Sequence, residues 1–146
     1  MTTTQNLVLD TNTVMALWHF DDPALRTLAQ AIEAGEVVLY SRDDALEELR
    51  RVLGYGQFRI AIGDQQDLLE RYRARTHPAP PPADEPSPLP ACRDRDDQKF
   101  LEIARDAGVS HLLTRDKLLL KLARHHLLRN RFRILTPERF IADGLR

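Results

Sequence analysis

The chain has 146 residues, a length that suits one folded domain with a hydrophobic core. Its 21 lysine and arginine residues nearly balance its 22 aspartate and glutamate residues, so the net charge of -1 indicates no general affinity for nucleic acid. The single cysteine, Cys92, excludes an internal disulfide and a cysteine-rich zinc site. There is neither a membrane-spanning apolar run nor a signal-peptide pattern. We therefore expect a cytoplasmic protein with one domain at residues 1–146.

The most informative stretch lies near the N-terminus. After Asn6, residues 7–9 form an apolar, strand-forming run that stops at Asp10, and Thr11 and Asn12 are good residues for starting a helix. Ligands of open parallel sheets bind outside the carboxyl ends of the strands, so Asp10 is a candidate metal ligand or nucleophile. The alternative is that Asp10, Thr11 or Asn12 only caps the helix that follows.

The next part of the chain alternates between helical and strand-like patterns. Apolar residues recur at helical spacing after the Asp21–Pro23 start signal, as far as Gly35. Residues 36–40 predict a second buried strand, and residues 42–53 and 60–75 predict two further helices.

The helix over residues 42–53 carries two adjacent acids. On a helical wheel Glu48 borders the apolar stripe, whereas Glu47 lies nearly opposite and should be solvated. Glu48 is therefore the acid that could reach a site at the sheet edge. The alternative is an exposed glutamate that pairs with Arg50 or Arg51.

Composition changes sharply after this helical region. Residues 76–91 are rich in proline, and we expect a surface loop there within the same domain. A docking segment for a proline-binding partner is the alternative.

Helical signals resume at Asp94, a plausible N-cap that places Asp97 in the first turn, where the helix dipole favours a carboxylate. Asp97 also falls on the inward face, because Phe100 and Leu101 follow it by three and four residues. An aspartate at the start of a buried face usually has a partner or a metal. Asp96 lies near the same face and is a competing candidate.

The last third of the chain repeats the pattern of strand, acid and helix. Residues 109–114 predict a strand that leads to Asp116, which repeats the geometry of Asp10. We expect a helix with its inward face at residues 118–123, a strand at 133–135 and a final helix from Thr136. Alternation of strands and helices favours a parallel sheet covered on both faces.

Four acids thus lie at element ends that a parallel sheet gathers at one edge: Asp10, Glu48, Asp97 and Asp116. Like charges a few ångströms apart raise one another's pKa, so such a cluster is unfavourable unless cations neutralise it. A set of oxygen ligands without histidine or cysteine suits Mg²⁺ or Mn²⁺ better than zinc.

Several segments in this order resemble the PIN-domain ribonucleases, in particular the VapC-like toxin components of type II toxin–antitoxin modules. They are residues 7–12, 46–49, 94–104, 113–116 and 134–140. The resemblance implies a three-layer α/β/α fold with a central, mainly parallel sheet of four to five strands. It also implies a metal-dependent endoribonuclease, a homodimer and a cognate antitoxin whose segment enters the acidic groove.

The resemblance places the family's acidic quartet on Asp10, Glu48, Asp97 and Asp116. The polar residues that would support this quartet are Thr11, Asn12, Thr114 and Asp94. This chain departs from the family at Arg115, where a small or neutral residue is usual, and in its proline-rich linker. Both departures bear on substrate preference more than on chemistry.

The chemistry suggests separate roles for these acids. We hypothesise that Asp10, Asp97 and Asp116 bind the metal directly, and that Glu48 binds it through water or positions the attacking water. Contacts to RNA phosphates are expected from basic residues near the site, with a solvated helix end as the alternative. These residues are Arg115, Lys117, Arg124, Arg129 and Arg131, whereas His125 and His126 have no assigned role.

Two other functions fit parts of the sequence. Residues 7–14 also resemble the opening motif of haloacid-dehalogenase-like phosphatases, in which the aspartate is a nucleophile. The second acid of that motif is replaced by Asn12, and the chain is short for that fold. A non-catalytic PIN-like module that binds RNA or protein is the other alternative, although all four acids are present.

Overall fold

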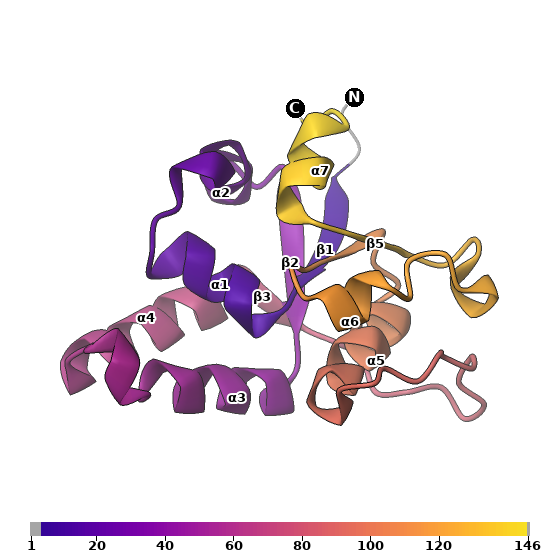
Figure 1. Ribbon diagram of the computed structural model, residues 1–146, viewed down its shortest axis with the longest axis horizontal. Helices are drawn as coiled ribbons and strands as arrows, with labels where there is room; N and C mark the ends of the chain where they lie inside the picture. Colours follow the sequence, from indigo (N-terminus) through magenta and orange to yellow (C-terminus); the bar gives the residue numbers. More distant parts are fainter. Residues whose placement is uncertain (1–3, 146) are drawn as a thin grey trace.

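The computed structural model describes residues 4–145, which are built around a five-stranded parallel sheet with the strand order β3-β2-β1-β4-β5 (Figure 1). Parallel strands place all their carboxyl ends at one edge, so the residues that follow them become neighbours. The strands are β1 (Gln5–Leu9), β2 (Val37–Ser41), β3 (Thr76–Pro78), β4 (His111–Leu113) and β5 (Arg133–Leu135).

The expected layers of helices cover both faces of this sheet. Figure 1 shows α1 to α4 on one side and α5 and α6 on the other, and α7 packs on the same face as α2. The fold is therefore the three-layer α/β/α arrangement expected from the sequence. The helices are α1 (Thr11–Trp18), α2 (Arg26–Glu33), α3 (Asp43–Leu53), α4 (Ile62–Arg75), α5 (Gln98–Ala107), α6 (Lys117–Leu120) and α7 (Pro137–Ala142).

Side chains of the central strands point alternately to two hydrophobic cores. Leu7 and Leu9 of β1 lie in the core under α1, α2, α4 and α7, whereas Val8 lies in the core under α5 and α6. This is why β1 reads as a continuous apolar run, because a parallel strand buries both of its faces.

The register of β1 against β4 determines which residues at their carboxyl ends become neighbours. Leu9 of β1 is paired with Leu113 of β4, and the backbone N–H of Asp10 donates to the carbonyl of Leu113 at 3.3 Å. The residues that follow these two strands are Asp10 and Thr114, so the pairing brings them together at the carboxyl edge.

The expected loop at residues 76–91 is wrong in its first three residues. Thr76–Pro78 forms β3, which pairs with β2 from Leu39 to Ser41. Strand β3 lies at the sheet edge, where the missing N–H of Pro78 is tolerated. Residues 79–91 have no helix or strand, as expected of the loop.

The helix expected through residue 123 is also shorter than predicted. Helix α6 ends at Leu120, residues 121–124 form turns, and a short 3₁₀ helix follows at His126–Leu128. Ala123, expected to face inward, is exposed. The chain has to turn here to enter β5 parallel to β4, and this tertiary requirement prevails over the helical pattern.

None of the helices within residues 4–145 has the length and apolar character needed to cross a membrane.

Leu101→Ala is expected to lower the free energy of unfolding by about 3 kcal/mol, because Leu101 of α5 is fully buried and its truncation leaves a cavity. Ile62→Ala is the matched control, since Ile62 is 73% exposed, and should change stability by less than about 0.5 kcal/mol. Urea denaturation followed by circular dichroism measures both. Equal losses in the two variants would contradict this description of the core.

Candidate functional site

Asp10 is buried at the carboxyl end of β1 and is also the N-cap of α1. Its Oδ1 accepts hydrogen bonds from the backbone N–H of Thr13 at 2.9 Å and from the Thr13 hydroxyl at 2.6 Å. Its Oδ2 accepts one from the Thr114 hydroxyl. The capping alternative is therefore correct, but capping uses only Oδ1. Burial raises the pKa of Asp10, while the hydrogen bonds of Thr114 and Thr13 oppose this shift.

Asp116 repeats this arrangement after β4. Its Oδ1 caps α6 by accepting the backbone N–H of Leu118 at 2.7 Å. The backbone N–H of Asp116 donates to the Thr114 hydroxyl at 2.9 Å, and the same hydroxyl donates to Asp10. Thr114, which is fully buried, thus connects the two acids. Within residues 4–145, Asp116 Oδ2 accepts no hydrogen bond.

Glu48 of α3 points into the site, as its position on the helical wheel predicts. Its Oε2 accepts a hydrogen bond from the Thr11 hydroxyl at the start of α1. Its Oε1 lies 2.7 Å from the ammonium nitrogen of Lys99 on α5. Glu47 instead pairs with Arg50 on the exposed face of α3, so the alternative pairing proposed for Glu48 is wrong.

Asp97 comes from the 3₁₀ turn Arg95–Asp97, directly before α5. Burial, together with the negative charges of Asp116, Asp94, Asp10 and Glu48, raises the pKa of Asp97 to about 7. The other three acids singled out in the sequence, Asp10, Glu48 and Asp116, thus lie close enough to Asp97 to disfavour its ionised form. Asp96, the competing candidate, is exposed.

The two other expected supporting residues lie further out. Asn12 is exposed on α1, and within residues 4–145 its side chain makes no hydrogen bond. Asp94 is also exposed and caps the 3₁₀ turn by accepting the backbone N–H of Asp96 at 3.0 Å. Asp94 contributes to the site through its charge, whereas Thr11 and Thr114 contribute hydrogen bonds.

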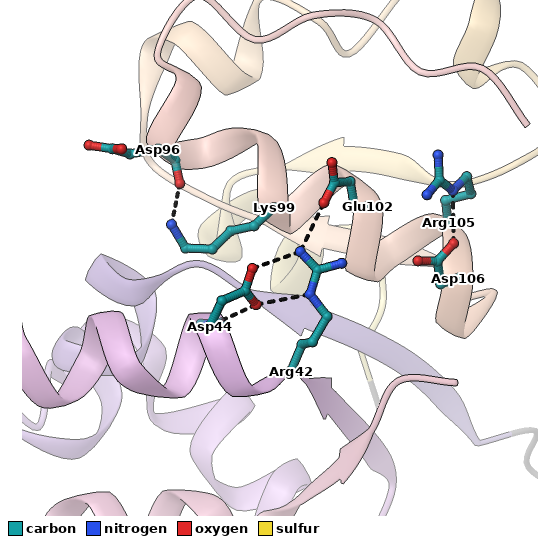
Figure 2. Close-up of polar contacts among 8 residues, drawn as sticks. Arg42, Asp44, Asp96, Lys99, Glu102, Arg105 and Asp106 are labelled. Atoms are coloured by element: carbon teal, nitrogen blue, oxygen red, sulfur yellow. Dashed lines mark hydrogen bonds and ion pairs between the residues drawn. The ribbon is translucent and has the colours of Figure 1, made fainter. Parts of the chain in front are cut away.

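An ion-pair network holds α3 against α5 beside the site. Figure 2 shows Arg42, at the start of α3, between Asp44 on the same helix and Glu102 on α5, at 2.7 and 2.8 Å. Lys99 extends from the first turn of α5 in the same view. These ion pairs join α3, which carries Glu48, to α5, which begins directly after Asp97.

The basic side chains expected to contact RNA differ in whether they already have partners within the protein. Arg115 is held by Asp22 at 2.8 Å and by Glu138 at 2.9 Å, and Arg131 donates to the Ser87 hydroxyl at 2.6 Å. The other three side chains are exposed and form no ion pair within the part of the chain that the structure describes. They are Lys117, Arg124 and Arg129.

The donor chemistry of the site fits a hard divalent cation. In residues 4–145 there is no group of three or more acid, histidine or cysteine side chains already spaced to hold a metal ion. The negative charges of the other acids nevertheless act on Asp97, and both Asp97 oxygens and Asp116 Oδ2 accept no hydrogen bond from the described residues. Carboxylate oxygens of this kind are the ligands that Mg²⁺ and Mn²⁺ prefer.

Sequence reasoning missed two residues of this site. Thr13 is buried and gives Asp10 two hydrogen bonds, and its position three residues after an N-cap is the available signal. Lys99 pairs with Glu48, and the sequence gives no signal of this because the contact joins two separate helices.

Asp97→Asn is expected to flatten the pH dependence of stability in the metal-free protein. The raised pKa of Asp97, about 7, means that the folded protein binds this proton more tightly than the unfolded chain does. The contribution of Asp97 to the free energy of unfolding therefore falls as pH rises from about 4 to about 7, and the substitution removes this contribution. Urea denaturation at pH 5 and pH 8 with a chelator measures the difference. Asp64→Asn, on the exposed first turn of α4, is the control, and an unchanged fall in the Asp97 variant would contradict the expectation.

Comparison with known proteins identifies the family. A family model described as the PIN domain matches residues 6–118, well over half of the chain and all four acids. Searches of curated proteins and of solved structures gave no match. PIN domains are generally metal-dependent nucleases, so the match indicates a nuclease-type function. The chain belongs to the PIN domain family.

Proposed function

We propose that this protein is a metal-dependent endoribonuclease that hydrolyses RNA phosphodiester bonds with Mg²⁺ or Mn²⁺. The observation that carries the proposal is the convergence of Asp10, Glu48 and Asp116 on Asp97, whose pKa is raised to about 7 by burial and by the negative charges of Asp116, Asp94, Asp10 and Glu48. Such a cluster stores repulsion that a divalent cation relieves. Membership of the PIN domain family supports the same chemistry.

The acids divide the work according to the partners of their oxygens. Asp97 and Asp116 are direct ligands, because each keeps an oxygen without a hydrogen bond within residues 4–145. Asp10 is the third ligand, because its oxygens accept only from neutral N–H and O–H groups, whereas Glu48 faces the ammonium group of Lys99. Glu48 acts through water or positions the attacking water. When bound, the ion supplies a water of lowered pKa and positive charge beside the phosphate. Thr114 keeps the carboxylate of Asp10 and the backbone of Asp116 in place during the reaction.

The segment that follows Asp116 supplies a surface for the RNA backbone. Residues 117–133 contain six lysine and arginine residues and no acid. Lys117, Arg124 and Arg129 extend into solvent from this segment. Positive side chains beside an acidic site attract phosphates without reading the sequence of the bases.

We also propose that the protein is the toxin of a toxin–antitoxin module, acting in the cytoplasm as a homodimer and inhibited by a cognate antitoxin. The order of the motifs at residues 7–12, 46–49, 94–104 and 113–116 supports this proposal through its resemblance to VapC-like toxins. The phosphatase alternative has no support from the family match. The non-catalytic alternative is separated from ours by the experiment below.

Asp10→Asn is expected to reduce Mn²⁺-dependent RNA cleavage by more than about 100-fold, because losing only an outer partner of a ligand already costs 10–100-fold. Asparagine is as good an N-cap as aspartate, so α1 should remain folded. Cleavage is followed with mixed RNAs at a fixed Mn²⁺ or Mg²⁺ concentration, and with a chelator in place of the metal.

Asp64→Asn removes an exposed acid from α4 and serves as the matched control, with cleavage equal to wild type. Activity that survives both the chelator and Asp10→Asn would refute the metal-dependent mechanism. Binding of RNA without cleavage in the wild type would support the non-catalytic alternative instead.

A triple variant with alanine at Lys117, Arg124 and Arg129 is expected to bind single-stranded RNA more weakly and with less dependence on salt. Each lost phosphate contact reduces the slope of log K against log salt by about 0.7, so the slope should fall by about 2. Fluorescence anisotropy in a chelator measures binding without cleavage. The control carries alanine at Arg26, Arg59 and Arg73, which are exposed elsewhere on the protein. An equal change in both variants would refute the assigned surface.

A further inference from the structure

The acidic site contains a positive charge of its own, that of Lys99. The ammonium nitrogen of Lys99 lies 2.7 Å from Glu48 Oε1, and the two side chains are only 14% and 17% exposed. The same nitrogen donates to the backbone carbonyl of Asp96, a contact drawn in Figure 2. It also lies 5.3 Å from the centre of the Phe100 ring. These contacts hold the ammonium group in one place between α3 and α5.

Lys99 and Thr11 together occupy both oxygens of Glu48. The Thr11 hydroxyl donates to Oε2, and Lys99 approaches Oε1. Asp97 and Asp116 each keep at least one oxygen without a hydrogen bond within residues 4–145. Asp10 has both oxygens in hydrogen bonds, but only with neutral N–H and O–H groups, so Glu48 differs from these three acids in its contact with a positive charge. The free oxygens of the site therefore lie away from Glu48, and the ammonium group lies next to it.

We propose that Lys99 occupies a permanent cation position beside Glu48, so that the acidic site holds one divalent ion, on Asp10, Asp97 and Asp116. A second divalent ion at Glu48 would have to displace the ammonium group, or sit next to its positive charge in a partly buried, weakly screened environment. Lys99 thereby sets the number of metal ions without binding the metal itself. The inference rests on the proposed metal-dependent function.

Binding of Mn²⁺ to the metal-stripped protein, measured by isothermal titration calorimetry without RNA, tests this inference. The wild type should bind one ion. Lys99→Met keeps the length of the side chain but removes its charge, so Glu48 becomes available and a second ion should bind, or the single ion should bind at least about tenfold more tightly. Lys99→Arg keeps the charge and should bind one ion like the wild type. Lys121→Met removes an exposed lysine of the turn after α6 and should also leave binding unchanged.

Glu48→Gln provides a second test in case circular dichroism shows that the Lys99→Met variant does not fold. Because Glu48 does not ligate the ion directly, this variant should still bind one Mn²⁺ with an affinity within about tenfold of the wild type. Two ions in the wild type, unchanged binding in a folded Lys99→Met variant, or loss of the ion in Glu48→Gln would each overturn the inference.

These outcomes are independent of RNA cleavage. A wild type that binds one Mn²⁺ and gains an ion in Lys99→Met, yet cleaves no RNA, would support the role of Lys99 and refute the proposed nuclease. Cleavage abolished by Asp10→Asn, combined with two ions in the wild type, would leave the nuclease standing and remove the role of Lys99.

Discussion

The hydroxyl group of Thr114 makes the contacts on which the arrangement of this site depends. It donates to the carboxylate of Asp10 and accepts the backbone N–H of Asp116, so one fully buried side chain joins the ends of β1 and β4. The pairing of Leu9 with Leu113 brings these groups within reach of each other. The carboxylates of Asp10 and Asp116 also cap α1 and α6, the helices that follow the two strands. The orientation of the site is therefore coupled to the packing of the central strands.

The buried strands of the fold can be predicted from the sequence, whereas the edge strand β3 cannot. Strands β1, β2 and β4 are short apolar runs that end at polar residues, and burial on both faces produces that pattern. Strand β3 has no such pattern, because Thr76–Pro78 lies at the edge of the sheet and forms a strand only through its pairing with β2. Local pattern therefore predicts buried strands, whereas an edge strand depends on what it meets in three dimensions.

The candidate site divides in the same way. Asp10 and Asp116 are recognisable because one carboxylate directly follows a buried strand and the other follows a second buried strand by three residues, and Glu48 is recognisable from its place beside an apolar stripe. Lys99 is not recognisable, since its importance comes from the approach of α5 to α3. A linear pattern identifies groups placed by their own element. It does not identify a charge that matters because another element lies opposite.

The proline-rich loop is fastened at both ends and free between them. The backbone N–H of Ala79 donates to the carbonyl of Ser41, and the backbone carbonyl of Ser87 accepts from Arg105 at 3.1 Å. Residues 80–86 between these anchors are all exposed. Exposed loop tips of small and polar residues are sites where proteins tolerate insertions. This span is consequently the natural place to insert a fluorophore tag or a peptide epitope while leaving the nuclease chemistry intact.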